Sequence, residues 1–193
     1  MEPISLVESI FEAAALYATN YHEDVRGLFG RLYCPDALRE FWGDRSVCQV
    51  NLSSNPIRGT IRGLHFQHDP WPDAKLVRCL SGEVLDVIVD LRQGSPTFLQ
   101  HRAIHLTPES GNLLFVPEGF AHGFQSLLEH SSLLYIHSAR YDPGFLGGLR
   151  YDDPILGIKW PLPCSQVSER DLSSSWLGDD FQGLSVNAFR EPS

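Results

Sequence analysis

Long apolar runs are missing from this chain of 193 residues. No uninterrupted apolar segment approaches the roughly 20 residues that a membrane-spanning helix needs. The first residues, MEPISLVESI, place no basic segment ahead of their apolar side chains, whereas a secretory signal peptide begins with one. We therefore expect no membrane partner and a cytoplasmic location.

Paired cysteines are also missing. The four cysteines, Cys34, Cys48, Cys79 and Cys164, lie far apart and form no C-x-x-C motif. Zinc knuckles and thioredoxin-type redox sites depend on such close spacing. Because a reduced cysteine behaves as a small hydrophobic residue, we expect four buried free thiols.

Basic residues are scarce: 15 Lys and Arg stand against 24 Asp and Glu, which gives a net charge of -9. Such a chain repels nucleic acid at long range, so we expect no nucleic-acid partner. Any phosphate group would have to bind at a local cluster of arginines.

Short runs of β-branched and aromatic residues, separated by Gly, Pro, Asn and Asp, dominate the chain and predict many short strands. The clearest runs are residues 84–91, 113–117 and 132–138. No internal repeat or linker divides the chain, so we expect one domain over residues 1–193, with a core over about 24–171 and a polar tail from about 173. Strands at this spacing favour a sandwich or barrel with a jelly-roll interior.

Side-chain alternation with period two assigns faces to these strands. In residues 84–91 one face carries Asp86 and Asp90, which predicts one wetter face. In residues 132–138, Tyr135 and His137 share a face. Outside the strands, Pro35 begins a segment with the pattern of a short covering helix.

The segment RGLHFQ places His65 on one strand face with Gly63, and Arg62 on the other. A lone strand histidine is either structural or a candidate base. If Arg62 also faces the site, Gly63 must carry a bulge or a twist.

A second histidine, His122, stands in the segment PEGFAHGF, which resembles the P-x-G-x-x-H motif of the cupin superfamily. Many cupins bind a metal there together with an H-x-H pair. Here the spacing of His65 and His68 puts them on opposite faces of a regular strand, so we expect no metal, although a metal-dependent cupin using these three histidines stays an alternative.

Four further residues have two interpretations each. Asp171 follows Ser168 in an S-x-x-D pattern that is typical of a helix N-cap, or its carboxylate orients a histidine. Tyr135 and Tyr141 suit the mouth of a barrel whether or not they transfer protons. Arg26 lies in an expected turn, yet an arginine there could bind a phosphate.

Taken in order, the motifs of the chain resemble the dTDP-4-dehydrorhamnose 3,5-epimerase family. They are DxRGxF from Asp24, QxN from Gln49, RGLHFQ from Arg62, KLVRC from Lys75, GEVLDVIVDLR from Gly82, SPTF from Ser95, PEGFAHGF from Pro117, LY at Leu134 and DDPxLGIxWP from Asp152. The resemblance implies an all-β fold, a double-stranded β-helix (cupin jelly roll) with a few short covering helices. It also implies a homodimer with exchanged N-terminal strands, no cofactor, and a nucleotide-diphosphate sugar as the substrate.

The resemblance assigns roles to particular residues. It implies that His65 is the base, that Asp171 pairs with it, and that Tyr135 is the acid on the opposite face of a 4-keto-6-deoxy sugar. Lys75 would stabilise the enolate formed next to the C4 ketone. The implied substrate contacts are Arg26, Gln49, Asn51, Arg62, His122, Tyr141 and Arg170, of which Tyr141 would stack on the nucleotide base.

Three positions depart from the family pattern. Arg31 and Leu146 each replace an acidic residue, and His137 lies in the segment Ile136-His137-Ser138, where the family often reads K-T-T after the tyrosine. These changes leave open a C3-only monoepimerase acting on a non-rhamnose, possibly CDP-linked, sugar. A non-catalytic module that binds nucleotide sugars is the third alternative.

Overall fold

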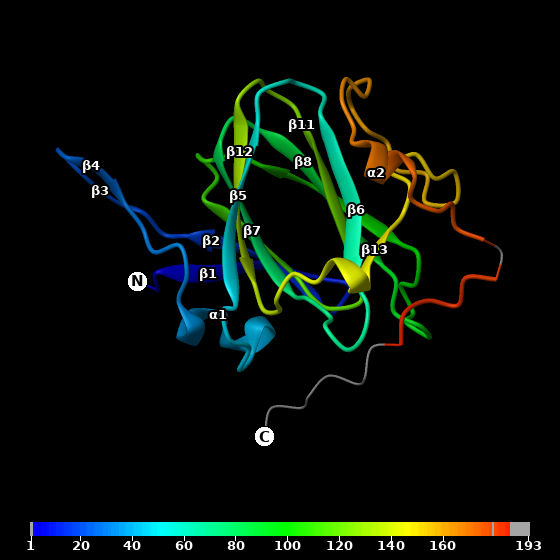
Figure 1. Cartoon of the computed structure of the whole chain (residues 1–193). Helices are drawn as coiled ribbons and strands as arrows, with labels where there is room; N and C mark the ends of the chain where they lie inside the picture. The colour runs from blue at the N-terminus through cyan, green and yellow to red at the C-terminus, as the bar shows by residue number, and fades with distance from the viewer. Residues whose placement is uncertain (1, 179, 186–193) are drawn as a thin grey trace.

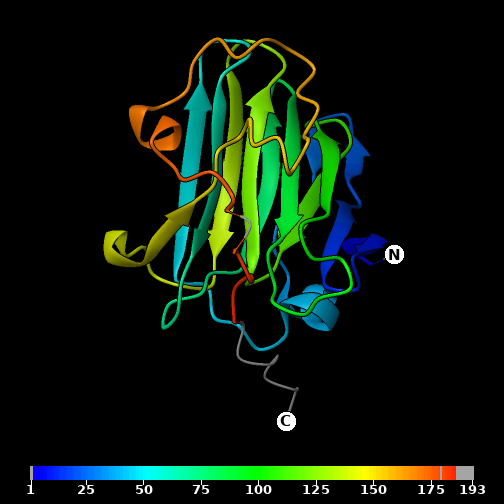
Figure 2. The ribbon, with the colours of Figure 1, turned by 90° about the vertical axis from the view of Figure 1, so that its right-hand side faces the viewer.

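The computed structural model describes residues 2–178 and 180–185, so the end of the predicted polar tail, residues 186–193, lies outside the described residues. Two antiparallel sheets pack face to face into a jelly roll (Figures 1 and 2). This confirms the predicted all-β fold. Within the described residues, no helix combines the length and the apolar character needed to cross a membrane.

The first sheet has six strands in the order β1-β2-β10-β7-β12-β5. Their bounds are β1 Ile4–Ile10, β2 Ala14–Thr19, β10 Asn112–Val116, β7 Lys75–Ser81, β12 Ser131–His137 and β5 Gln49–Asn55. Because β1 and β2 precede residue 24 and supply buried Ile4, Ile10 and Ala14, the N-terminal segment is part of this sheet and its core.

The second sheet has five strands in the order β13-β6-β11-β8-β9. Their bounds are β13 Leu146–Gly148, β6 Ile61–Gln67, β11 Phe120–Ser126, β8 Val84–Asp90 and β9 His101–Leu106. β5 is an edge strand of the first sheet, and β13, followed by β6, is at an edge of the second. These edges lie on the same side of the sandwich (Figure 1).

Three short helical elements and one hairpin lie outside these two sheets. The helix α1, Pro35–Trp42, covers the outer face of the first sheet with Leu38 and Trp42, as its sequence predicts. A single helical turn, α2 (Glu169–Leu172), lies beside β6, and a 3-10 turn, η1, spans Pro143–Phe145. The hairpin β3–β4, His22–Asp24 and Gly27–Phe29, stands away from both sheets (Figure 1).

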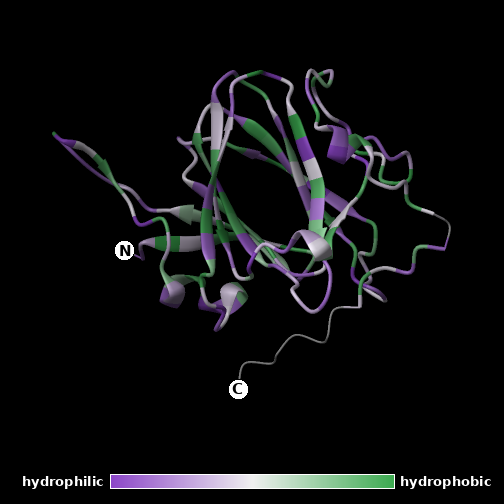
Figure 3. Ribbon diagram, viewed as in Figure 1, coloured by the Kyte–Doolittle hydropathy of each residue, from purple (hydrophilic) through white to green (hydrophobic). Residues whose placement is uncertain are grey.

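The core fills the space between the sheets at one end and leaves a polar cavity at the other. One apolar cluster, which includes Val77, Ile88, Leu114 and Phe124, joins the two sheets. Hydrophobic and hydrophilic segments alternate along β6 (Figure 3). A strand with this pattern can pack with one face and present polar side chains with the other.

The predicted wetter face of residues 84–91 is wrong, because every residue of β8 is buried. Asp86 and Asp90 are both fully buried and are satisfied inside the protein. Asp90 accepts hydrogen bonds from Arg92, Ser95 and Thr97, whereas Asp86 pairs with a histidine in the cavity. The polar face of this strand is therefore internal.

The predicted burial of the cysteines is only partly correct. All four thiols are free, as expected, but Cys79 alone is buried, and Cys48 is exposed.

Candidate active site

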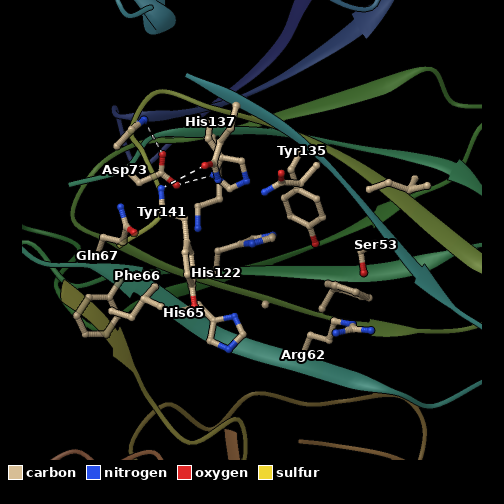
Figure 4. A pocket seen from close by; sticks show the side chains of 18 of the residues that line it. Ser53, Arg62, His65, Phe66, Gln67, Asp73, His122, Tyr135, His137 and Tyr141 are labelled. Carbon is tan, nitrogen blue, oxygen red and sulfur yellow. Dashed lines mark hydrogen bonds and ion pairs between the residues drawn. The ribbon is translucent and has the colours of Figure 1, made fainter. Parts of the chain in front are cut away.

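The cavity between the two sheets has a volume of about 380 Å³. Figure 4 shows side chains from β6 projecting into it toward the facing sheet. Most of the residues predicted from the sequence line this one space. They are Gln49, Asn51, Arg62, His65, Lys75, His122, Tyr135, Tyr141 and Arg170.

His65 and Asp171, separated by 106 residues in sequence, form a hydrogen bond of 2.7 Å between Nε2 and Oδ1. The His65 side chain is about a third exposed toward the cavity, while Asp171 is buried behind it. Because Nε2 is engaged by the carboxylate, Nδ1 of His65 is the nitrogen left for the cavity.

Asp171 is held from three sides. Burial by itself raises the pKa of this carboxyl, but the hydrogen bonds that it accepts from His65, the Gly63 N–H and Ser168 outweigh this effect, and the pKa stays below its ordinary value. The Asp171 N–H donates to the Ser168 hydroxyl. The residue of the S-x-x-D pattern thus makes both contacts, since its backbone N–H is bound by the capping Ser168 while its carboxylate binds His65.

Gly63 explains why Arg62 and His65 both line the cavity although they alternate along β6. Its φ is +119°, and the pairing of β6 with β11 shifts register between His122 and Phe124. A Cβ at Gly63 would lie 2.6 Å from the Cα of Gly123. The irregularity predicted for this glycine is confirmed, and it requires glycine on both strands.

Tyr135 lies on β12 of the opposite sheet and packs edge-on against His122, with 5.9 Å between the ring centroids. Burial, together with the nearby Asp86 carboxylate, raises the pKa of Tyr135 well above its ordinary value. The phenol is therefore protonated at neutral pH.

His122 and Lys75 form the inner part of the cavity around Asp86. Nε2 of His122 lies 2.9 Å from both carboxylate oxygens of Asp86, and burial lowers the pKa of His122 despite this pairing. Burial also lowers the pKa of Lys75, and the nearby carboxylates of Asp73 and Asp86 partly offset this decrease. The sequence reasoning missed Asp86 as a site residue, although its place on the polar face of a strand was a usable signal.

The sequence reasoning also missed the pairing of His137 with Asp73. His137 Nδ1 lies 2.7 Å from Oδ2 of Asp73, and the His137 ring stacks on Tyr135 with 5.9 Å between the centroids. The shared face of Tyr135 and His137 confirms the prediction from alternation. Asp73 lies in the loop before β7, 64 residues away from its partner.

The mouth of the cavity is formed by residues of the edge strands and the adjoining loops. Gln49 accepts a hydrogen bond from the Tyr141 N–H at 3.2 Å, and Arg62 donates to the Asn55 side chain at 2.7 Å. Of the three departures from the family pattern, His137 and Leu146 line the cavity and Arg31 does not.

Arg26 is the predicted contact that the structure does not bring to this cavity. It lies in the turn of the β3–β4 hairpin, where its guanidinium pairs with Asp24, and it does not line the cavity of its own chain.

The three histidines of the metal alternative are not arranged as a metal site. His65 and His122 each direct Nε2 to a carboxylate, and His68 packs against Phe66 outside the cavity lining. Among residues 2–178 and 180–185, no group of three or more His, Cys, Asp or Glu side chains is placed to hold a metal ion.

Fold and site together define a cupin-type jelly roll whose cavity sets a histidine–carboxylate pair against a tyrosine on the opposite sheet. The profile of the family "dTDP-4-dehydrorhamnose 3,5-epimerase" matches residues 9–179. The chain belongs to this family of isomerases.

Individual relatives agree with this assignment. The chain is 42% identical over 155 residues to a dTDP-4-dehydrorhamnose 3,5-epimerase of Sinorhizobium fredii, which covers 80% of each protein. It is 38% identical over 157 residues to a dTDP-4-dehydrorhamnose 3-epimerase of Streptomyces niveus, covering 81% of this chain and 75% of that protein.

A solved structure extends the likeness to three dimensions. The dTDP-6-deoxy-D-glucose-3,5-epimerase of Legionella pneumophila, in complex with dTDP-4-keto-L-rhamnose, superposes with a TM-score of 0.88 at 32% identity, over 96% of this chain and 100% of that one. The comparisons do not favour the metal-dependent alternative.

Proposed function

We propose that this protein epimerises a dTDP-linked 4-keto-6-deoxy sugar at C3 and C5 through an enolate. The observation that carries the proposal is that His65 on one sheet is paired with Asp171 of α2, with 2.7 Å between Nε2 and Oδ1, while Tyr135 lies on the other sheet. Inversion at carbon requires a base on one face of the sugar and an acid on the opposite face, and the two sheets supply one each.

The reaction begins with removal of the C3 proton. The C4 ketone acidifies the C–H bonds at C3 and C5. Nδ1 of His65 accepts the proton, because Nε2 is occupied by Asp171, and the C–H electron pair moves into the enolate. Asp171 holds the imidazole in the tautomer that leaves Nδ1 free and faces the imidazolium as it forms.

The enolate is then protonated from the other side. Lys75 is the cation placed within the cavity to stabilise the charge that develops on the ketone oxygen. Tyr135 donates its phenolic proton to the carbon from the face opposite His65, which inverts that centre. His65 releases its proton to water through its exposed edge, and Tyr135 regains a proton before the sequence repeats at C5.

The remaining cavity residues are proposed to bind the substrate. His122 would contact the sugar. The nucleotide portion would be held by Gln49 and Asn51 of β5, Arg62 of β6, Tyr141 of the loop after β12 and Arg170 of α2. The resemblance in sequence and the position of each in the cavity lining support this assignment.

The proposal is tested by incubating the protein with dTDP-4-keto-6-deoxyglucose in D2O and following C3 and C5 by NMR. Deuterium at both carbons supports the double epimerase. Deuterium at C3 alone would make the protein a 3-epimerase, as its Streptomyces niveus relative is named. No deuterium at either carbon, with the dTDP-linked or the corresponding CDP-linked sugar, would refute the proposal. It would favour the alternative of a non-catalytic module that binds nucleotide sugars.

We also propose a homodimer in which the β3–β4 hairpin is the exchanged segment. Val25 is fully exposed and Phe29 is 76% exposed on this hairpin, an apolar surface that a second subunit would cover. The arrangement would carry Arg26 to the partner's cavity. Light scattering should give twice the chain mass, and a mixture of inactive Arg26→Ala and His65→Ala proteins should regain activity after subunit exchange.

Three expectations from the sequence stay predictions: a single domain over residues 1–193, a cytoplasmic location and no binding of nucleic acid. Limited proteolysis, cell fractionation and a filter-binding assay test them in turn.

A further inference from the structure

His137 and Asp73 form a largely buried pair that lines the cavity and to which the proposed mechanism gives no role. Their side chains are 14% and 7% exposed, and Asp73 is bound twice, by Nδ1 of His137 at 2.7 Å and by the Ala139 N–H at 3.1 Å. The carboxylate is thus fixed by the backbone that follows β12. It fixes the imidazole ring in turn.

The orientation of the ring leaves one nitrogen for a ligand. Because Nδ1 is taken by Asp73, Nε2 is the remaining polar atom of a residue that lines the cavity, and no described residue forms a hydrogen bond with it. A polar atom that faces a cavity and has no protein partner is open to a hydrogen bond with water or with a ligand.

The position of β12 in the sheet indicates which part of a substrate lies beside His137. β5 is the edge strand, and β12 and β7 follow it toward the interior. His137 is paired across the sheet with Gln49 on β5 and with Lys75 on β7. Lys75 and Tyr135, which the proposed mechanism places at the sugar, are the neighbours of His137 across the sheet and on the same face of β12, so the group that reaches His137 is the sugar.

We propose that His137, positioned by Asp73, is a substrate contact whose Nε2 forms a hydrogen bond with an oxygen of the sugar ring, either a hydroxyl or the ketone. This rests on the proposed function and names a specificity residue for it. His137 stacks on Tyr135, so the same contact fixes the sugar relative to the acid.

Two substitutions separate this role from a structural one. His137→Asn keeps an amide near the position of Nδ1, and with it the bond to Asp73, but has nothing at the position of Nε2. His137→Gln reaches the position of Nε2 and loses the bond to Asp73. His105→Asn is the matched control, because His105 pairs with Glu83 at 2.9 Å on the protein surface, away from the cavity.

Steady-state kinetics with dTDP-4-keto-6-deoxyglucose and calorimetry with dTDP and dTDP-glucose provide the readouts. We expect His137→Asn to lower kcat/KM about 10- to 100-fold, the loss typical of one hydrogen bond within a binding site, and to leave the Kd of dTDP within about twofold of the parent value. His137→Gln should retain most of the activity, and His105→Asn all of it.

The calorimetry identifies the oxygen and keeps the two proposals apart. A higher Kd of dTDP-glucose in His137→Asn indicates a contact with a hydroxyl. An unchanged Kd of dTDP-glucose, with kcat/KM for the keto sugar reduced, indicates a contact with the ketone oxygen. A parent protein without epimerase activity would refute the proposed function, while the dTDP-glucose affinity would still test His137. A parent-like His137→Asn, or an equal loss of affinity for dTDP itself, would overturn the inference.

Discussion

Asp171→Asn should remove catalysis without unfolding the protein. The amide oxygen can still accept the Gly63 N–H, which lies 3.1 Å from Oδ2, and the backbone bond to Ser168 is untouched. The amide NH2 would then face His65 Nε2 and donate to it, so the proton of the neutral imidazole moves to Nδ1. That nitrogen faces the cavity and can no longer accept a proton from carbon.

The magnitude follows from the role that is lost. A well-placed general base contributes about 100- to 10,000-fold to a rate, which corresponds to about 3 to 5 kcal/mol of activation free energy. We expect kcat for deuterium uptake at C3 to fall by this factor, measured by NMR with dTDP-4-keto-6-deoxyglucose. The Kd of dTDP, measured by calorimetry, should change by less than about twofold.

Asp152→Asn is the control, because Asp152 pairs with Arg150 outside the cavity. It should leave kcat within about twofold of the parent value. A loss of less than about tenfold in Asp171→Asn, with the fold intact by circular dichroism, would refute the assignment of Asp171 as the partner that holds the base.

Three further predictions concern stability and metal dependence. Gly63→Ala should lower the free energy of unfolding by about 2 kcal/mol or more in chemical denaturation, because its Cβ would meet Gly123 at 2.6 Å and its φ is +119°; an unchanged midpoint would contradict this. The pKa of Asp90 is affected first by burial, which raises it, but bonds from Arg92, Ser95 and Thr97 hold it below its ordinary value. Its stabilising contribution is therefore complete above a pH of about 3.9, the pKa of an unfolded Asp, and is lost as pH falls through the lower folded pKa. Acid titrations of unfolding should show a smaller loss in Asp90→Asn than in the parent, and parallel curves would count against it. Dialysis against EDTA should leave epimerisation within about twofold of the untreated rate, whereas activity restored only by added metal would favour the metal-dependent alternative.

Much of the fold could be predicted from local patterns. Alternation in residues 132–138 placed Tyr135 and His137 on one face, and a strand glycine predicted the irregularity that lets Arg62 and His65 share the cavity. The same alternation misled at β8, since polar residues on one strand face indicate water only when that face is outside. In a jelly roll they can equally face the interior, as Asp86 does beside His122.

The partners of the site residues were harder to predict, because they come from distant segments. Asp171 was identified through the resemblance to a family, since its S-x-x-D pattern by itself also predicts a helix cap. Asp73 had no such motif, and its bond to His137 depends on how the loop before β7 meets the end of β12. Pairings of this kind are fixed by sheet topology and not by local sequence.

The central claim is that the base and the acid act from opposite faces of the sugar. Tyr135→Phe tests it most directly when the protein is incubated with dTDP-4-keto-6-deoxyglucose in D2O and both deuterium content and configuration at C3 are read by NMR. The account predicts deuterium at C3 with the original configuration, because His65 still removes the proton, exchanges it with solvent and returns deuterium to the same face. Inversion at the parent rate in Tyr135→Phe, or deuterium uptake that persists in His65→Ala, would contradict it.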